Sequence, residues 1–331
     1  MPASVCLIVN PSAGGGKAGR VAPEVERTLR EHGLQVRRVD TRDLAHARVL
    51  AEEGARAGET VVALSGDGMI GVVADVLRNI PGAVLGVLPG GRGNDLARVL
   101  GIPQDPIAAC AVIADGVPRA MDVGEVAGQA FVGIASVGFD SEANRIANEA
   151  PSWLGNLVYA YGALRALAAW RPARFEIELD PPGERHVFSG YTIGACNSRT
   201  YGGGMRAAPD ALLDDGLLDV VVLRSISKFR FLTRILPRVF SGTHVHEPSV
   251  SVFRAREVSI SADRPFAMYA DGDPIGDLPV RVRAVRGAVS VLVPADFAGE
   301  SAFASPVDSS PIRAPESAAG AADPAEHTMR D

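Results

Sequence analysis

The chain has 331 residues, a formal net charge of −6 and 47% apolar residues, which suits two globular domains with buried cores. No apolar run reaches the ~18 residues of a membrane span. No charged leader precedes the first apolar segment, so we expect no secretory signal. The three cysteines are scattered and do not form a disulfide framework, so we do not expect an oxidising compartment. The segment 299–331 carries a net charge of −4, which leaves a nearly neutral body and no electrostatic reason to expect a nucleic-acid partner.

The first 120 residues alternate between apolar strands and amphipathic helices. Strands are predicted at 5–9, 34–39, 60–64 and 83–88. The helical patterns between them end at Gly33, Gly58 and Pro81. Because the strands are almost continuously apolar, they predict a doubly wound parallel sheet with helices on both faces. We assign this α/β domain to residues 1–121.

From residue 122 the pattern is that of a β domain. Strands are predicted at 130–137, 174–179, 187–195, 217–223, 249–252, 257–260 and 288–293. Two helices, at 152–169 and 226–240, interrupt them. This pattern predicts an antiparallel β-sandwich over residues 122–298. The acidic segment 299–331 is rich in Ala, Pro and Ser and is predicted to be disordered.

Three glycine-rich polar loops follow strands of the first domain. They are Asn10–Lys17, Ser65–Gly68 and Pro89–Asp95. Loops after parallel strands meet at one edge of the sheet, where α/β proteins bind ligands. Glycine lets backbone N–H groups approach an anion, and each loop opens a helix whose N-terminus favours phosphate. The three loops together predict a nucleotide or phosphate site, although each one alone also suits a simple tight turn.

Two common nucleotide motifs are absent. The Gly16-Lys17 pair is followed by Ala18 rather than Ser or Thr, so the first loop is not a Walker A motif. No loop has the Gly-x-Gly-x-x-Gly pattern with an acid at the following strand end. Phosphoryl transfer on another scaffold therefore fits better than hydride transfer.

Five motifs, in this order, resemble those of the diacylglycerol and sphingosine kinases. They are Asn10-Pro11 with its glycines, Ser65-Gly66-Asp67-Gly68, Leu88–Arg98, the stretch from Asn197 through Gly202–Met205 to Asp215–Val220, and Asp271-Gly272-Asp273-Pro274. The resemblance covers residues 4–295 and is nearest to the soluble bacterial lipid kinases. It implies an ATP-dependent kinase that phosphorylates the hydroxyl of a membrane lipid, with diacylglycerol as the first candidate.

The resemblance also implies roles for individual residues. ATP would lie between the domains and contact Asn10, Pro11, Ser12, Ala13, Gly14, Thr41, Gly66, Asp67, Gly68, Met69, Arg92, Gly93 and Asn94. Asp67 would approach the phosphates or their Mg²⁺. A structural Mg²⁺ would be held at Leu212, Asp215 and Leu217 by one carboxylate and two backbone carbonyls. From the residues alone, Asp67, Asn94 and Thr41 also suit helix caps, and Asp215 suits an ordinary Asp-Gly turn.

The general base is predicted in Asp271-Gly272-Asp273. Residues two apart on a strand share a face, so both carboxylates would point into one cleft. Two acids so close raise the pKa of one of them, which suits a base. Asp271 is the preferred base, and Asp273 either orients it or helps at the nucleotide; a β-turn is the structural alternative.

Other functions remain open at this stage. Met69 and Val72 stand where the family has Thr and Glu, which leaves a weak or inactive nucleotide-binding relative as an alternative. Two further alternatives are a lipid kinase that acts on a sphingosine-type acceptor and an NAD kinase. The resemblance places the protein in the cytoplasm, peripheral to the inner membrane surface, with a homodimer left open. Arginines and large apolar residues on the helices at 152–169 and 226–240 suit either a lipid mouth or core packing.

Overall fold

The computed structural model of the chain describes residues 4–149, 158–295 and 302–304. Its N-terminal part contains four parallel strands in the order β2-β1-β3-β4. They are β1 (Ser4–Val9), β2 (Gln35–Asp40), β3 (Thr60–Ser65) and β4 (Val84–Pro89). The central strands are buried along almost their whole length, which requires cover on both faces.

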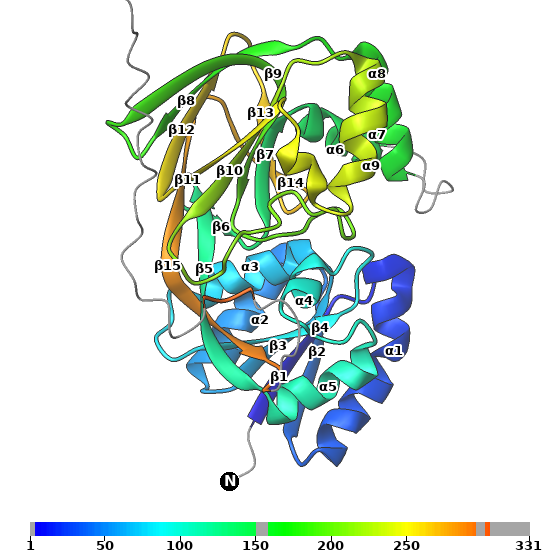
Figure 1. Cartoon of the computed structure of the whole chain (residues 1–331). Helices are drawn as coiled ribbons and strands as arrows, with labels where there is room; N and C mark the ends of the chain where they lie inside the picture. Colours follow the sequence, from blue (N-terminus) through cyan, green and yellow to red (C-terminus); the bar gives the residue numbers. More distant parts are fainter. Residues whose placement is uncertain (1–3, 150–157, 296–301, 305–331) are drawn as a thin grey trace, which may run out of the picture.

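Helices supply that cover (Figure 1). They are α1 (Ala13–Glu31), α2 (Leu44–Arg56), α3 (Asp67–Leu77), α4 (Asp95–Val99) and α5 (Pro106–Asp115). Helices α1 and α5 pack together, as do α2 and α3, and the two pairs cover opposite faces of the sheet. The loops that precede α1, α3 and α4 follow the parallel strands β1, β3 and β4, so all three lie at the carboxyl edge of the sheet. The predicted doubly wound domain is confirmed.

The second part of the chain is an antiparallel β domain, as predicted. Its strands are β6 (Gln129–Phe131), β7 (Ile134–Gly138), β8 (Ala173–Leu179), β9 (Glu184–Cys196), β10 (Leu218–Arg224), β11 (Val250–Ala255), β12 (Glu257–Ala262), β13 (Ala267–Ala270) and β14 (Asp273–Asp277). The main order is β14-β13-β7-β9-β8-β12, with β10 between β9 and β11. Strand β8 alternates buried and more exposed residues, as expected when one face lies on a core.

Several helices lie on one side of this domain. They are α6 (Phe139–Glu149), α7 (Val158–Ala169), α8 (Lys228–Arg230), the π-helical turn η2 (Phe231–Ile235), α9 (Leu236–Val239) and the short 3₁₀ helix η3 (Thr243–His246). The helix predicted at 226–240 is thus observed as one helical run from α8 to α9. Of the helix predicted at 152–169, the part from residue 158 is confirmed, and 152–157 lie outside the described residues. Helix α6 was not predicted.

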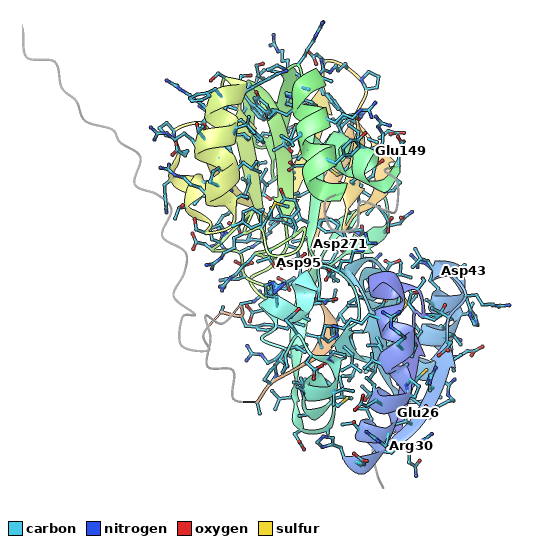
Figure 2. The ribbon with its side chains drawn as sticks, turned by 90° about the vertical axis from the view of Figure 1, so that its right-hand side faces the viewer. Glu26, Arg30, Asp43, Asp95, Glu149 and Asp271 are labelled. Atoms are coloured by element: carbon cyan, nitrogen blue, oxygen red, sulfur yellow. The ribbon has the colours of Figure 1, made fainter. Side chains whose placement is uncertain are left out.

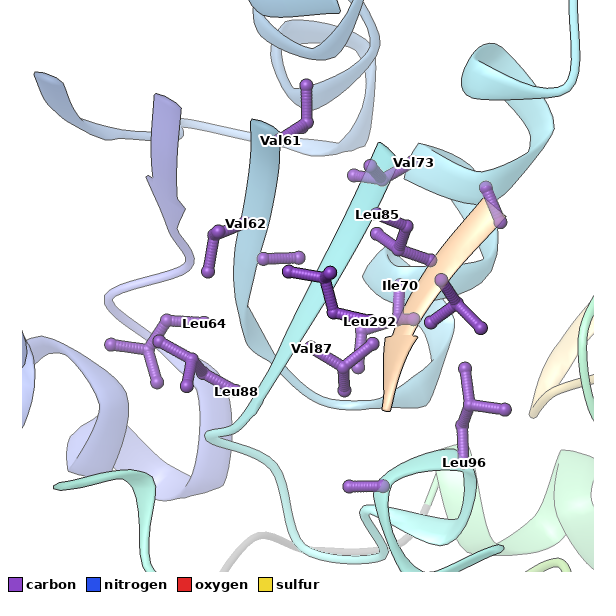
Figure 3. Packing of buried hydrophobic residues seen from close by; sticks show 14 of the residues in the cluster. Val61, Val62, Leu64, Ile70, Val73, Leu85, Val87, Leu88, Leu96 and Leu292 are labelled. Carbon is purple, nitrogen blue, oxygen red and sulfur yellow. The ribbon is translucent and has the colours of Figure 1, made fainter. Parts of the chain in front are cut away.

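Two long strands join the domains. Strand β5 (Val117–Val126) pairs antiparallel with β15 (Val280–Val293). The start of β15 pairs with β12, whereas its end lies parallel to β4, with Ser290 opposite Val84. Figure 3 shows Leu292 of this end packed among side chains of β4 and α3. The strand predicted at 288–293 therefore completes the first domain, and its assignment to the β-sandwich is corrected.

The end of the described chain also returns to the first domain. Ala302 and Phe303 are buried in its core. The amide of Leu213 donates to the carbonyl of Ala302 at 2.7 Å, and the amide of Ala304 donates to Asp214 Oδ1 at 2.6 Å. Residues 302–304 are therefore ordered within the segment predicted to be disordered, because burial of an aromatic ring fixes them; residues 299–301 and 305–331 lie outside the described residues. Within the described part of the chain, no helix has both the length and the apolar character needed to cross a bilayer.

Candidate active site

A cleft of about 570 Å³ lies between the two domains. Its first wall is made by loops of the α/β domain, through Asn10, Ala13, Gly14, Ser65, Gly66, Asp67, Gly68, Met69, Gly91, Arg92, Gly93, Asp95 and Leu96. Its second wall is made by the β domain, through Val132, Gly133, Ile134, Ser136, Thr200, Tyr201, Gly202, Gly203, Met205, Tyr269, Asp271 and Gly272. The loops predicted to bind a nucleotide are thus brought to one place, and the β domain faces them.

The first loop is shaped by its glycines and by Asn10. Three successive residues, Gly14, Gly15 and Gly16, have φ of 59°, 68° and 86°, a left-handed run that side chains with a Cβ rarely adopt. Asn10 Oδ1 accepts from the amide of Ser12 at 3.2 Å and from its hydroxyl at 2.8 Å. Asn10 therefore closes the turn while it lines the cleft. Of the predicted contacts in this loop, Ala13 and Gly14 also line the cleft, whereas Pro11 and Ser12 do not.

The second and third loops come into close backbone contact at Gly66 and Gly91. A Cβ on Gly91 would lie 2.4 Å from the Cα of Gly66, so Gly91 has no room for a side chain; a Cβ on Gly66 would lie 3.2 Å from the Cα of Gly91, a tight contact. Asn94, with φ of 51°, accepts through Oδ1 from the Gly91 amide at 2.7 Å and donates back to its carbonyl at 3.2 Å. Asn94 thus holds the third loop from behind and does not line the cleft.

The Asp67 side chain stabilises a helix, but a different one from its own. Asp67 Oδ1 accepts from the backbone amide of Leu96 in α4 at 3.0 Å. A Cβ on Gly93 would lie 3.1 Å from the other carboxylate oxygen. Asp67 therefore joins the second loop to the third, and it keeps one oxygen at the cleft wall without an amide donor among the described contacts. The cap predicted on its own helix is wrong, because Asp67 lies inside α3, whose N-cap is Gly66 and has no side-chain cap bond. The predicted place beside a ligand suits this geometry.

Asp95 ties the two walls together, which the sequence did not predict. Its carboxylate accepts from the amides of Gly203 and Gly204, both at 2.8 Å. Asp95 is buried, and this burial, together with the nearby charge of Asp67, raises the pKa of its carboxyl. The sequence signal that could have predicted this contact was the Gly202–Gly204 run. The positive φ angles of these glycines expose successive N–H groups to one acceptor.

Asp271 lines the cleft on the side of the β domain. It and Gly272 form a two-residue turn between β13 and β14, with φ of 49° and 99°. The carboxylate accepts from three successive amides, those of Val132 (2.8 Å), Gly133 (2.9 Å) and Ile134 (3.1 Å). Burial raises the pKa of Asp271 to about 7; the charge of Asp67 also raises it, and the amides oppose the shift.

Two predictions about this region need correction. The strand predicted at 130–137 is broken between β6 and β7, because the amides of residues 132–134 bind the Asp271 carboxylate. The two acids of Asp271-Gly272-Asp273 do not share one face of a strand, because a turn separates β13 from β14. Asp273 is exposed and does not line the cleft; its carboxylate lies beside Gly68 at the start of α3.

The remaining predicted nucleotide contacts divide into two groups. Met69 and the exposed Arg92 line the cleft, as do Gly66, Gly68 and Gly93. Thr41 is buried outside it. Its amide donates to the carbonyl of Val9 at 2.8 Å and its hydroxyl to the carbonyl of Asp43 at 2.7 Å. These bonds fix the start of α2 and account for Thr41 without a ligand.

The carboxylate of the predicted magnesium site binds protein groups. Asp215 Oδ1 accepts from the amide of Leu217 at 2.9 Å, and Oδ2 pairs with the guanidinium of Arg254 at 2.5 Å. Arg254 also approaches Asp219, at 3.4 Å. Arg254 is therefore one partner of the Asp215 carboxylate. A magnesium ion held by this carboxylate and the backbone carbonyls of Leu212 and Leu217 stays a prediction. The described residues contain no group of three His, Cys, Asp or Glu side chains that could hold a metal ion, but a site of this kind needs only one carboxylate.

Comparisons with known proteins give the family. A family model described as the diacylglycerol kinase catalytic domain matches residues 4–126, and one described as the YegS C-terminal NAD kinase beta sandwich-like domain matches residues 133–293. A diacylglycerol kinase of Mycobacterium tuberculosis is 34% identical over 300 residues, which cover 88% of this chain and 95% of that protein. The chain belongs to the diacylglycerol kinase family. It is a lipid kinase.

Further relatives agree with this assignment. A diacylglycerol kinase of Bacillus subtilis is 29% identical over 277 residues, covering 82% of this chain and 90% of that protein. A crystal structure of a diacylglycerol kinase from Bacillus anthracis superposes with a TM-score of 0.69 at 21% identity and covers 88% of this chain and 97% of that one. At this identity the structural likeness confirms the two-domain fold.

An apolar cavity of about 130 Å³ adjoins the cleft of this lipid kinase. Ile134, Tyr201 and Met205 line both spaces, so they form the partition between them. The cavity wall contains one acid, Asp140, which accepts from the hydroxyl of Thr192 at 3.1 Å. Burial raises the pKa of Asp140 to about 6. Sequence reasoning missed this cavity because it is built from ordinary apolar side chains of α6, β9, β10 and the α8–α9 run.

Proposed function

We propose that the protein transfers the γ-phosphate of ATP to the hydroxyl of a membrane lipid, with diacylglycerol as the acceptor and phosphatidic acid as the product. The observation that carries this proposal is the position of Asp271, a carboxylate with a pKa of about 7 that faces three glycine loops across one cleft. The names of the relatives, diacylglycerol kinases of Mycobacterium tuberculosis and Bacillus subtilis, support the choice of acceptor.

The glycine loops suit the nucleotide phosphates. Gly66, Gly68, Gly91 and Gly93 leave backbone without side chains along the cleft wall, and the N-terminus of α3 adds a positive dipole end. Arg92 is exposed at the same wall and supplies a guanidinium that can bind phosphate oxygens in a bidentate way. Mg²⁺ held by the nucleotide would neutralise charge on the transferred phosphoryl group.

Asp271 suits the proton transfer. The lipid hydroxyl oxygen forms a bond to the γ-phosphorus as the bond from that phosphorus to the β–γ bridging oxygen breaks, and ADP leaves with that electron pair. The hydroxyl proton passes to the Asp271 carboxylate. A base whose pKa lies near the operating pH is best placed for this step, and the three amides from residues 132–134 hold its orientation.

The apolar cavity suits the lipid chains. It adjoins the cleft at Ile134, Tyr201 and Met205, so a lipid whose chains occupy it would have its hydroxyl on the side of the cleft that Asp271 lines. An apolar cavity beside the cleft favours a lipid acceptor over a soluble one such as NAD. The protein would work in the cytoplasm at the inner membrane surface.

A product screen tests the proposal. The protein, ATP and Mg²⁺ are incubated with diacylglycerol, sphingosine and NAD in parallel, and phosphorylated products are identified by mass. We expect phosphatidic acid, and its loss in Asp271→Asn. A phosphorylated sphingosine or NADP as the main product would replace the proposed acceptor. Tight ATP binding with no phosphorylated product would show instead that the protein is an inactive relative of the kinases. This outcome is worth testing because Met69 and Val72 stand where the family has Thr and Glu.

A further inference from the structure

One face of helix α3 lies against the β domain (Figure 1). Its residues are three or four positions apart and therefore form one row along the helix; they are Gly68, Gly71, Asp75 and Arg78. We call this row the α3 face. A Cβ on Gly71 would lie 3.2 Å from Asp271 Oδ2, and a Cβ on Gly68 would lie 3.9 Å from the Asp271 carbonyl oxygen. The two glycines thus leave room for the turn that carries Asp271.

The charged half of the α3 face binds the hairpin formed by β5 and β6. Asp75 Oδ1 accepts from the backbone amide of Ala130 at 2.9 Å. Arg78 donates to the carbonyl of Gly128 at 2.7 Å and pairs with Glu125. Among the described strands β6 pairs only with β5, so its outer edge is held by α3 in place of another strand.

Two guanidinium groups fix the Asp75 carboxylate. Arg48 of α2 pairs with Oδ2 at 2.8 Å, and Arg78 pairs with Oδ1 at 3.0 Å. Asp75 is only 7% exposed, and charge-assisted bonds of this kind hold a carboxylate firmly. The amide of Ala130 therefore meets an acceptor that has little freedom to move.

The hairpin leads directly to the amides that hold Asp271. Ala130 precedes by two residues the first of the three successive amides, 132–134, that bind the Asp271 carboxylate. Helix α3 thus contacts this carboxylate at Gly71 and anchors the segment that orients it at Asp75, one turn further along the same face. The same helix begins with Asp67, and Asp271 lies where the two domains meet (Figure 2).

We propose that Asp75 is a positioning residue for phosphoryl transfer: by binding the Ala130 amide it fixes the segment 130–134, and through it the Asp271 carboxylate, against α3. This inference rests on the proposed function, in which Asp271 accepts the hydroxyl proton. Asp75 does not line the cleft, so it acts through the segment and not on the substrate. Without this anchor the amides of 132–134 withdraw, and Asp271 loses its orientation and the hydrogen bonds that favour its ionised form.

Kinetics of two variants of Asp75 test the proposal. Asp75→Ala removes the acceptor, and kcat should fall by about 100-fold, as expected when a catalytic group is displaced, whereas KM for ATP should change little. Asp75→Asn keeps an oxygen acceptor for the Ala130 amide and should stay within about tenfold of the wild type. Ala130→Pro removes the same hydrogen bond from the donor side and keeps every ion pair. It should reproduce the loss in kcat, and it serves as the test if Asp75→Ala does not fold.

The pH profile separates positioning from a general loss of stability. The amides of 132–134 lower the pKa of Asp271 and Asp67 of α3 raises it; residues 132–134 have no titratable side chain. When the amides withdraw, the pKa of Asp271 rises, so the acid limb of kcat/KM should move to higher pH in Asp75→Ala and Ala130→Pro. A merely structural role would leave the limb in place.

Asp105→Ala is the matched control. Asp105 caps α5 by accepting from the Ala108 amide at 3.0 Å, so this variant also loses one bond from a backbone amide to an aspartate, on the opposite face of the sheet. At equal amounts of folded protein, checked by circular dichroism, it should keep the wild-type kcat and pH profile.

Three outcomes decide between the proposals. Wild-type kcat and pH profile in Asp75→Ala and Ala130→Pro would overturn the positioning role and leave the kinase function intact. An equal loss in Asp75→Asn and Asp75→Ala, with Ala130→Pro fully active, would also overturn it, because the charge of Asp75 and not the amide contact would then matter. No phosphorylated lipid from the wild type would instead overturn the function on which the inference rests.

Discussion

The α/β wall of the cleft consists largely of backbone, whereas the β-domain wall presents a carboxylate from a turn. The first wall comes from three βα loops whose glycines pack without side chains, as Gly66 and Gly91 do. The second needs Asp271, whose carboxylate is held by amides from residues more than 130 positions earlier in the chain. One wall suits phosphate binding and the other suits proton transfer, and Asp95 joins them through the Gly202–Gly204 loop (Figure 2).

The largest expected effect belongs to the β-domain wall. Asp271→Asn should lower kcat by about 1,000-fold, within the range expected for loss of a general base, while ATP affinity changes little. Asparagine tolerates the left-handed backbone at this position, so the fold should be kept, which circular dichroism checks. Asp273→Asn serves as the control and should stay within about tenfold of the wild type, because Asp273 does not line the cleft. A larger loss in Asp273→Asn than in Asp271→Asn would reverse the two roles.

Asp67 tests whether the α/β wall contributes more than backbone. Asp67→Ala removes both the acceptor for the Leu96 amide and the charge, and kcat/KM should fall by at least about 100-fold. Asp67→Asn keeps an acceptor for that amide but has no charge for a cation held by the nucleotide. Steady-state kinetics of both variants separate the two contributions. Near-normal activity of Asp67→Asn would reduce Asp67 to a helix cap.

Phe303 tests whether the α/β domain depends on the end of the chain. Phe303→Ala should lower the free energy of unfolding by about 3 kcal/mol, at the low end for a buried aromatic residue, because its ring lies in the first core. Val49→Ala, at an exposed position on α2, should change it by less than about 0.5 kcal/mol. Urea denaturation measures both. Equal stability of the two variants would mean that residues 302–304 contribute nothing to the core.

The backbone contact between the second and third loops can be opened by one methyl group. Gly91→Ala places a Cβ 2.4 Å from the Gly66 Cα, so the loops must separate. We expect KM for ATP to rise about tenfold and the free energy of unfolding to fall by about 1–3 kcal/mol. Gly276→Ala is the control, since its Cβ would have no neighbour closer than 3.6 Å. An unchanged KM for ATP in Gly91→Ala would contradict a phosphate site at this contact.

The pH dependence of kcat/KM is the prediction with the smallest expected effect, and it tests the role of the β-domain wall in proton transfer. Burial favours the neutral form of Asp271 and raises its pKa to about 7, and only the ionised form can accept a proton. The value of kcat/KM should therefore fall about tenfold per pH unit below pH 7 and level off above it. The residual activity of Asp271→Asn should lack this slope. A wild-type profile that is flat from about pH 5 to pH 8 would exclude Asp271 as the base.

Sequence patterns predicted the α/β half of the site well because its residues act locally. A glycine loop between a buried strand and a helix must lie at the carboxyl edge of a parallel sheet, and the structure places Gly14, Gly66 and Gly93 there. Capping was the main ambiguity. Tertiary contacts that the local sequence pattern does not encode resolved it. The Asp67 carboxylate caps α4 rather than its own helix α3, and the Asn94 side chain accepts a hydrogen bond from the Gly91 amide.

The sequence by itself determined the two fold classes, the three loops and the family motifs, because local periodicity and turn chemistry encode them. Only the tertiary structure decided which domain received the end of β15 and residues 302–304, since an apolar strand has the same pattern in either core. It also decided that the amides of residues 132–134 break a strand to bind Asp271, and that Arg254 pairs with Asp215. These outcomes depend on partners far apart in the chain, and no local pattern records which distant group a carboxylate will meet.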